Sequence, residues 1–577
     1  MKVAWILLRA KAKTAIAIPR RFEAGNLYES QMEIPGTTVR GAFAAAFLNS
    51  GKPADENFCC LFENPSIRFG PLRPLPRGIE NLNKFIPVMP VPKSAQSCKY
   101  DGGLPEEGHG VLDLLFEVLG KTEASEHREE SCIKCGAPIE PLEKPWLIVD
   151  WKQNFGIDYK PDFRLNTHVG IGAVGTEEMG VAMEGRLFSL QCLPQGTNFS
   201  GWIAVGKDDP EILLKDLGFQ KSGGEIWRLP FDLRVGRRSS TYGALEIEAK
   251  VSNETPWRQT HGNFEERWRK FQEGFWRRFI SLEKLNLLSD DTSHFAKGYV
   301  FSVTFLTDTI LLDLFLRPYR ILIAEEVARR LGICESKVRL LATFTRSQII
   351  RGWNTAHCLP KEQDLAIVAG SVFLFIVQRD AIEECKLMRK LQEWEEKGIG
   401  WRRSEGFGQV IICDPWHVHK SEDGFVPLRR MAADEEIQGT VEFDKRVVEF
   451  VRAIEEKKGK VDLTKTQLQN LKTLAHIIDI AYRHLPGGLE IHPCERLKQH
   501  LEHQKEKGRG WSQEIQWKDK KIKVADGLKE VLDLDSCNWS VALQRLEHFV
   551  QLMLTSIEGT KLDEQFVVSE RLRGDVQ

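Results

Sequence analysis

The chain has 577 residues, more than one ordinary hydrophobic core can organise, so about three or four domains are expected. Its formal net charge of −2 excludes a globally basic nucleic-acid-binding protein, and any such surface must be local. No stretch approaches the roughly 20 apolar residues that cross a membrane, so no membrane partner is expected. Twelve cysteines without a secretory signal predict a reducing, cytoplasmic location.

The first predicted elements are a strand and a helix. Residues 2–18 alternate loosely between apolar and polar side chains, as strands do. Thr37 or Thr38 is then predicted to cap the N-terminus of a helix. Arg40 would lie in the first turn of that helix and strengthen its attraction for an anion. The alternative is that Arg40 is an ordinary solvated arginine.

Residues 50–165 are irregular and rich in Pro and Gly, and a long loop of this kind requires a function or a stabilising cross-link. The segment Cys132–Gly136 has the C-x-x-C-G spacing of half a zinc knuckle. Two further thiolates would complete the closed tetrahedral geometry of structural zinc. Cys59 is as well placed as Cys60 to supply one of them, and the alternative is that the thiols are free. The preferred ligand set is Cys60, Cys98, Cys132 and Cys135.

Residues 170–175 satisfy the G-x-G-x-x-G pattern of dinucleotide-binding loops. That fingerprint needs a preceding strand and a following helix, whereas here a polar stretch precedes and a predicted strand, residues 186–193, follows. A hairpin is therefore the better prediction. A strand at 199–205, a short helix at 210–217 and a closing strand at 244–251 complete the first set of elements.

Two glycine-rich loops, Gly236–Ile247 and Gly398–Val410, repeat one pattern of paired arginines, serine, an aromatic residue, glycine and an aliphatic residue. Glycine permits positive φ and close approach of a ligand. Free N–H groups and guanidinium forks in such a turn suit phosphate. An aliphatic-Arg-Gly triplet also precedes each loop, at Arg40 and Arg351, so the chain is predicted to contain two copies of one module. The aligned pairs are Arg237 with Arg402, Arg238 with Arg403, Ser239 with Ser404, Tyr242 with Phe407, and Gly243 with Gly408.

Residues 257–285 carry aromatic side chains at helical spacing between basic residues. This pattern favours a buried helix face over a base-stacking surface. The second copy is predicted as a strand at 299–306, a helix around Arg351, a strand at 371–378 and a charged helix at 380–397, with one strand unplaced.

The predicted fold class is α+β. Its predicted divisions are a first module at 1–252 with the insertion at about 50–165, a helical linker at 253–298, a second module at 299–427 and a C-terminal helical region at 428–577.

These features together resemble the RAMP superfamily of CRISPR-associated RNA-binding proteins, and within it the large RAMP subunit of type III-D effector complexes. The residues that carry the resemblance are IPGTTVRGAF at 34–43, LFSLQCLPQGTNFSG at 187–201, TRSQIIRGWN at 345–354, and the loops RVGRRSSTYG and GIGWRRSEGFG. The resemblance implies two ferredoxin-like (RRM-like) modules, each with its glycine-rich loop between the second helix and the last strand.

The resemblance also implies a non-catalytic subunit that grips the backbone of guide RNA, at its repeat-derived five-prime handle. Its partners would be the large polymerase-like subunit and the backbone RAMP subunits, with target RNA met indirectly. Structural zinc is the one cofactor expected, and none is expected for catalysis. The candidate RNA-binding residues are Arg40, Arg237, Arg238, Ser239, Tyr242, Gly243, Arg351, Arg402, Arg403, Ser404, Gly406, Phe407 and Gly408.

The alternative function is a RAMP endoribonuclease that processes guide RNA or cuts target RNA without a metal ion. His168, next to the predicted hairpin, is the first histidine to test, and Asp158 and Asp162 are the first aspartates. No paired acid and base is visible in the sequence, and each residue is equally explained as an ordinary loop residue. An RRM-like protein of general RNA metabolism is a third reading, which selectivity for CRISPR repeat RNA would exclude.

Overall fold

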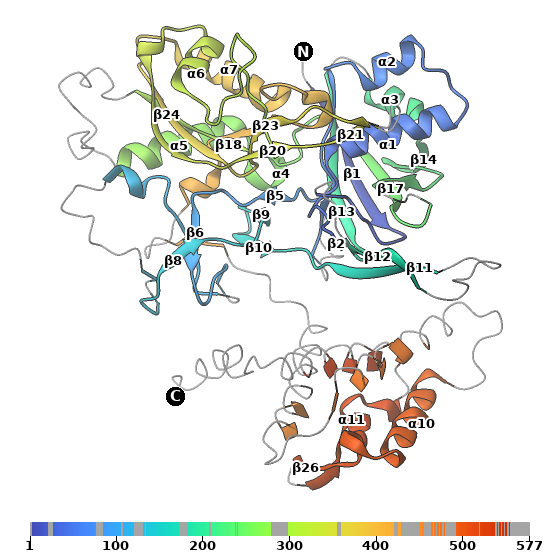
Figure 1. The fold of residues 1–577 in the computed structure, drawn as a ribbon. Helices are drawn as coiled ribbons and strands as arrows, with labels where there is room; N and C mark the ends of the chain where they lie inside the picture. Colours follow the sequence, from blue (N-terminus) through green and yellow to red (C-terminus); the bar gives the residue numbers. More distant parts are fainter. Residues whose placement is uncertain are drawn as a thin grey trace. The chain divides into compact units, whose positions relative to one another are not determined.

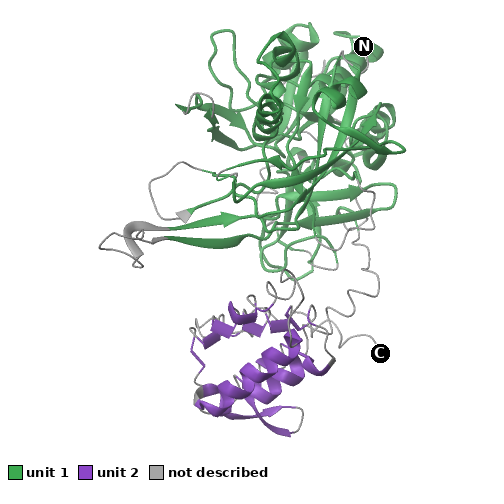
Figure 2. Cartoon of the chain, turned by 90° about the vertical axis from the view of Figure 1, so that its right-hand side faces the viewer, with its two compact units in different colours: residues 1–431 green, residues 432–577 purple. Residues whose placement is uncertain are grey.

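The computed structural model describes residues 3–20, 27–76, 85–105, 108–120, 131–171 except 133, 182–278 except 207–208, 237 and 239, and 298–428 except 355–358 and 420–424. Nearer the C-terminus it describes 492–517, 520–536 and scattered positions between 447 and 553. The fold is α+β, as the sequence predicts, and its elements are shown in Figure 1. The chain divides into two compact units, Met1–Met431 and Ala432–Gln577 (Figure 2).

The second module of unit 1 is a four-stranded antiparallel sheet in the order β19-β24-β18-β25. Taken along the chain the elements run strand, helix, strand, strand, helix, strand, and the spatial strand order is fourth, first, third, second when counted from β25. That is the ferredoxin-like arrangement. The bounds are β18 Tyr299–Phe305, α6 Ala324–Leu331, β19 Val338–Phe344, β24 Val372–Val377, α7 Glu384–Lys397 and β25 Val410–Ile412.

The first module has the same arrangement, with strand order β17-β1-β13-β3 and a hairpin, β14 and β15, extending the sheet beyond β17. Helices α1 and α3 pack on this sheet in one apolar core. The bounds are β1 Ala4–Ala12, α1 Gly36–Asn49, β3 Ile67–Phe69, β13 Asn198–Val205, α3 Pro210–Asp216, β14 Gln220–Gly223, β15 Ile226–Arg228 and β17 Ala244–Ser252.

The insertion contains short strands, and a long hairpin follows it, formed by β11 with β12, which pair from Arg164 opposite Cys192 onward. The other elements of unit 1 are β2 Leu27–Tyr28, α2 Glu56–Phe62, β4 Arg73–Pro74, β5 Met89–Pro90, β6 Ala95–Cys98, β7 Val111–Asp113, η1 Glu117–Gly120, β8 Ile139–Pro141, β9 Trp146–Asp150, β10 Phe155–Tyr159, β11 Arg164–Ile171, β12 Ala182–Cys192, β16 Leu233–Arg234, α4 Arg258–His261, α5 Phe264–Arg278, η5 Glu335–Lys337, β20 Ser347–Ile350, β21 Trp353–Asn354, β22 Leu359–Pro360, β23 Asp364–Ile367, η6 Arg403–Glu405 and η7 Pro415–His417.

The aromatic stripe of the linker forms part of the core, as predicted. Phe264, Trp268, Phe271 and Phe275 of α5 are all buried, and they belong to the core of the second module. The Trp268 indole N–H donates to Glu384 at the start of α7, at 2.8 Å. Apolar side chains at helical spacing therefore seat α5 on the sheet, and they are not available to stack on bases.

The helix predicted around Arg351 is wrong. Ser347–Ile350 form strand β20, which pairs with β23, because Ile349 and Ile350 are β-branched and an antiparallel partner is at hand. The first helix of the second module is α6 instead, which begins at Ala324, has two glutamates in its first turn and ends at Gly332 in the left-handed conformation. Arg351 follows β20 in a loop, so it has no counterpart in Arg40.

The predicted cap of the first helix is also wrong. Pro35 occupies the N-cap position of α1, no side chain caps the helix, and Thr37 and Thr38 lie inside it. Proline has a fixed φ that suits a helix start, which explains why the helix begins two residues early. Arg40 is consequently the fifth residue of α1 and lies beyond its first turn.

Unit 2 is mainly helical in its described part, as predicted, with one hairpin that the sequence analysis did not anticipate. Its elements are α10 Pro493–Glu506, η8 Arg509–Ser512, β26 Glu514–Trp517, β27 Lys520–Lys523, α11 Val524–Val531 and η9 Leu534–Ser536. These elements enclose a separate apolar core. Across the described residues of both units, none of the helices combines the length and apolar character that a membrane crossing requires.

Candidate nucleic-acid interface

The two glycine-rich loops share one backbone geometry. Gly243 and Gly408 have φ of +78° and +80°, and a Cβ on either would lie 1.8 Å from a carbonyl oxygen, that of Val235 or Ile399. Those same residues close the loops, because their N–H groups donate to Gly243 and Gly408 at 2.9 and 2.8 Å. Only glycine satisfies both the conformation and the spacing.

The geometry shifts the correspondence between the loops by one residue. Gly236 and Gly400 both have positive φ, and a Cβ on either would lie 2.4 Å from a backbone carbonyl oxygen. Two residues later, Arg238 and Arg402 have left-handed φ of +55° and +52°. Arg238 is therefore the structural counterpart of Arg402, and the sequence-based pairing with Arg403 is wrong. The second loop holds one extra residue before its last glycine, which a letter-by-letter match cannot place.

The first loop lies against the hairpin formed by β11 and β12. Arg238 is exposed, and its guanidinium carbon lies 4.3 Å from the centroid of the Phe188 ring. Phe188 stacks on His168 with centroids 5.1 Å apart and planes 13° apart. The His168 Nε2 atom is 2.7 Å from the Tyr242 hydroxyl, to which the Asn166 amide also donates at 3.2 Å. The structure thus brings together Arg238, Tyr242 and His168, which the sequence proposed separately. Arg237 and Ser239 lie outside the described residues.

The second loop neutralises its own arginine. Arg402 is 2.5 Å from Asp364 and 2.8 Å from Glu405 (Nη–carboxylate oxygen distances). Burial alone would raise the pKa of Glu405, but hydrogen bonds from Arg402 and Thr37 and the charges of Arg402 and Lys361 outweigh it and lower this pKa to about 2. Glu405 is therefore a carboxylate at any physiological pH, and Arg402 is an internal ion-pair partner.

The same carboxylate ties the second loop to the first module. Glu405 lies 3.5 Å from Arg40 of α1 and 3.0 Å from Lys361, and Lys361 also donates to Thr37 at 3.1 Å. Arg40 in turn donates to the carbonyl of Phe62 at 2.7 Å. The charge of Arg40 is thus engaged inside the protein, which departs from both the phosphate-binding and the solvated interpretations.

Close backbone contact accompanies these ion pairs. A Cβ on Gly406 would lie 2.3 Å from the carbonyl oxygen of Phe69, and one on Gly36 would lie 2.6 Å from that of Glu405. Arg68 of β3 also crosses the junction and donates to Gln409 at 2.8 Å. Phe407 is buried, with the Arg402 guanidinium 5.1 Å from its ring centroid. The second loop therefore functions as a junction between the two modules.

Trp401 and Arg403 of the second loop retain contact with solvent. Arg403 is half-buried and donates to the carbonyl of Lys397 at 3.1 Å, while burial and then the charge of Arg330 lower its pKa. Trp401 is 53% exposed, and the sequence analysis missed it although a tryptophan between glycine and arginine was a usable signal. Ser404 is half-buried, and Arg351 is exposed in the loop after β20.

The candidate catalytic carboxylates differ in their surroundings. Asp158 is buried, lies 3.3 Å from the Lys144 ammonium and accepts the backbone N–H of Leu104 at 3.3 Å. These contacts explain Asp158 as a structural residue of the insertion. Asp162 is exposed in the connection between β10 and β11.

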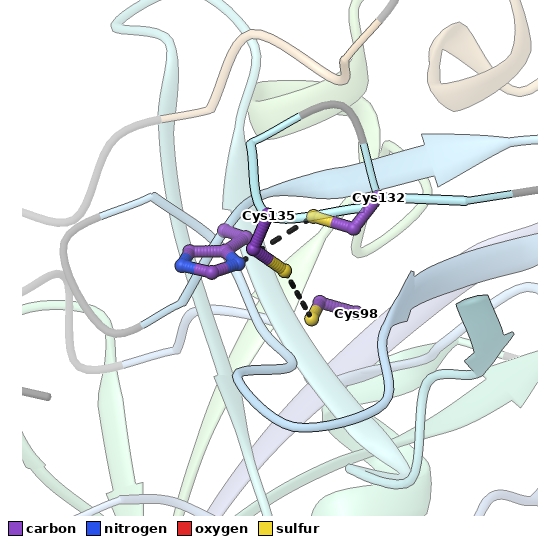
Figure 3. A group of neighbouring side chains, drawn as sticks. Cys98, Cys132 and Cys135 are labelled. Carbon is purple, nitrogen blue, oxygen red and sulfur yellow. Dashed lines mark hydrogen bonds between the residues drawn. The ribbon is translucent and has the colours of Figure 1, made fainter. Parts of the chain in front are cut away.

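Three of the four predicted zinc ligands meet, and the fourth prediction is wrong. Cys98, Cys132 and Cys135 lie together, as Figure 3 shows, and the fourth member of the group is His109. Cys60 and Cys59 lie on α2, where both are exposed. His109 lies 23 residues before Cys132, too far for sequence spacing to mark it as a ligand. Only the fold brings it to the cysteines.

The second module has a match among known families. Residues 279–414 match the family model of the CRISPR-associated protein (Cas_Cmr3). The matched segment contains all four strands of the second module and the Gly398–Val410 loop. The match does not extend to the first module or to unit 2.

Solved structures give a weaker likeness. One is the "Cryo-EM structure of the Type III-B Cmr-beta bound to cognate target RNA and AMPPnP, state 1", at 13% identity and a TM-score of 0.28, covering 68% of this chain and 94% of that chain. The corresponding complex with cognate target RNA alone matches at 11% identity and a TM-score of 0.26, with the same coverage. TM-scores this low do not establish a shared fold. No curated protein matches the chain.

Proposed function

We propose that the chain is a non-catalytic, guide-RNA-binding subunit of a type III CRISPR effector complex. The family match over residues 279–414 supports the class of protein. The RNA-binding part of the proposal rests on the position of Arg238 over Phe188. This position holds an exposed cation beside the stacked rings of Phe188 and His168. Such a surface suits a phosphate on one side and a base on the other.

The two loops are proposed to contribute unequally to RNA binding. Arg238 is exposed and faces no carboxylate within ion-pair distance among the described residues, whereas Arg402 is held by Asp364 and Glu405. The first loop would make the main phosphate contact, with Arg403 and Trp401 of the second loop adding to it. Binding through phosphate contacts would weaken as salt concentration rises.

The finer assignment extends the proposal to the III-D group and to the repeat-derived five-prime handle of the guide. In that setting the partners are the large polymerase-like subunit and the backbone RAMP subunits, and target RNA is met through its pairing with the guide. The resemblance of the two loops and of the 187–201 segment to RAMP proteins supports this assignment.

The test compares Arg238→Ala with Arg228→Ala in complexes purified from a host that carries the other subunits. Arg228 is an exposed arginine of the same module, on β15, where it pairs with Glu248, so it controls for loss of a surface positive charge. We expect Arg238→Ala to lower affinity for guide RNA about tenfold and to reduce the salt dependence by roughly one phosphate contact. Equal affinities of the two variants across a salt series would overturn the proposal.

A second candidate, a metal-independent endoribonuclease, is favoured by one observation. His168 and Tyr242 are hydrogen-bonded at 2.7 Å, and imidazole and phenol are both competent general acids and bases. Incubating the complex with repeat RNA and with complementary target RNA separates the two functions. Products that disappear in His168→Ala or Asp162→Ala would establish the nuclease, and bound RNA without products would support the scaffold.

A further inference from the structure

Four side chains with metal-binding atoms converge in the insertion. Cys98 ends β6, His109 lies in the connection from β6 to β7, and Cys132 and Cys135 precede β8. Their ligand atoms all lie within 4.8 Å of one another. The Sγ atoms of Cys98 and Cys135 are 3.5 Å apart, and so are Cys132 Sγ and His109 Nδ1 (Figure 3).

These separations match a tetrahedral zinc site. Zinc lies about 2.3 Å from sulfur and about 2.0 Å from imidazole nitrogen, which places neighbouring ligand atoms roughly 3.5 to 3.8 Å apart. A disulfide is a poorer account, because an S–S bond is about 2.05 Å long and would leave the third thiol and the imidazole unexplained.

The backbone around the C-x-x-C is folded as a turn that brings both thiols to the group, with Cys132 buried and Cys135 exposed. The Cys132 N–H donates to Ala137 and the Gly136 N–H donates back to Cys132, each at 2.7 Å. Gly136 has φ of +72°, the left-handed conformation that glycine adopts at low cost. The local chain is thus already bent around the position that an ion would occupy.

The histidine is oriented by a carboxylate. His109 Nε2 lies 3.1 Å from Asp101 Oδ2, and the backbone N–H of His109 donates to the carbonyl of Asp101 at 2.9 Å. With Nε2 engaged in this way, Nδ1 faces Cys132. A carboxylate on the second ring nitrogen is the usual support for a metal-bound histidine.

We infer that Cys98, His109, Cys132 and Cys135 form a structural Zn²⁺ site, with Asp101 as the residue that positions His109. All four coordination positions are filled by protein, so the site is closed and has no place for a substrate. The proposal is independent of the proposed RNA-binding function.

The placement of the site explains what the metal would stabilise. The ligands lie at one end of the small sheet β7-β6-β8, whose strands are three or four residues long. From β7, Asp113 reaches the buried His417 of the second module at 3.0 Å, and Val111 accepts the N–H of Val426 at 2.9 Å. So small a sheet is not stable by itself. Zinc would hold it in the shape that joins the insertion to the second module.

The experiment measures zinc bound to the full chain purified under reducing conditions, by elemental mass spectrometry. We expect one zinc per chain, and loss of more than half of it in Cys132→Ser and in Cys98→Ser. Cys60→Ser is the matched control, since Cys60 is an exposed cysteine outside the group, and it should retain all the metal. Unchanged zinc content in Cys132→Ser would overturn the proposal.

Because ligand variants can fail to fold, two further measurements use folded protein. Asp101→Asn retains all four ligands, and we expect zinc to transfer to a chromogenic chelator at a 10- to 100-fold lower chelator concentration than for the natural chain. Cobalt-substituted natural chain should show the absorption bands of tetrahedral thiolate coordination. Metal-free chain with two thiols oxidised to a disulfide, or Asp101→Asn that matches the natural chain, would refute the site.

Discussion

The two glycine-rich loops have almost the same backbone and opposite electrostatic situations. Arg238 and Arg402 adopt the same left-handed conformation after the same kind of glycine. Arg238 extends over Phe188 at the surface, whereas Arg402 is enclosed by Asp364 and Glu405. The repeated motif therefore forms the same turn in both modules. The surroundings differ, because one copy lies at the surface and the other lies at the junction between the modules.

The largest effect is expected where the two loops are alike. Gly408→Ala would place a Cβ 1.8 Å from the carbonyl oxygen of Ile399, and the loop cannot relax without losing the hydrogen bond that closes it. We expect a loss of about 3 kcal/mol in the free energy of unfolding of unit 1, measured by urea denaturation. Gly51→Ala is the control, since Gly51 also has positive φ but has no atom within 4 Å of the new Cβ. Equal losses in both variants would show that the close contact is unimportant.

The next effect concerns the charge at the centre of the junction. Glu405→Gln removes the carboxylate that faces Arg402, Arg40 and Lys361. We expect a loss of about 2 kcal/mol, below the full value for a buried pair because the partners are partly exposed to solvent.

The pH dependence of Glu405 has a definite sign. Its pKa is lowered from 4.5 to about 2, so its contribution is fully present above pH 4.5 and disappears as pH falls toward 2. The difference in unfolding free energy between the natural chain and Glu405→Gln should therefore shrink across that interval. A difference that stays constant from pH 6 to pH 2.5 would contradict the assignment.

A smaller effect separates the two arginines. Arg402→Ala should lower the unfolding free energy by about 1 to 2 kcal/mol and leave the affinity for guide RNA within twofold, because its charge is used internally. Arg238→Ala should leave the unfolding free energy almost unchanged and lower the affinity for guide RNA about tenfold. Denaturation and RNA binding should both be measured on both variants. A loss of RNA affinity in Arg402→Ala would contradict the assignment of Arg402 to an internal ion pair.

The smallest effect tests the stack beneath Arg238. Phe188→Leu keeps an apolar side chain but removes the ring that lies under the guanidinium and against His168. A cation–π contact at an exposed site contributes about 0.5 to 1 kcal/mol, so a two- to fivefold loss of RNA affinity is expected by fluorescence anisotropy. Leu165→Ala, at an exposed apolar position on neighbouring β11, is the control. An unchanged affinity in Phe188→Leu would leave Arg238 as a simple point charge.

Features coded within a few residues were predictable from the sequence. The helix stripe of α5, the strands β18 and β24, the turn glycines Gly243 and Gly408 and the C-x-x-C of the insertion all follow from local periodicity or backbone chemistry. The unplaced strand β19 and the misassigned strand β20 lack a clear alternation of buried and exposed side chains, so periodicity could not identify them.

Tertiary structure alone decided which charged and metal-binding groups meet. His109 lies beside three cysteines, Glu405 pairs with Arg40 and Lys361, and Arg238 contacts Phe188, in each case across many residues of chain. An electrostatic or coordination partner is chosen by distance in space, and sequence spacing sets that distance only within a turn of helix or a hairpin. The sequence therefore determined that two arginine-bearing turns exist, and the packing of the modules determined that one is exposed and the other is neutralised.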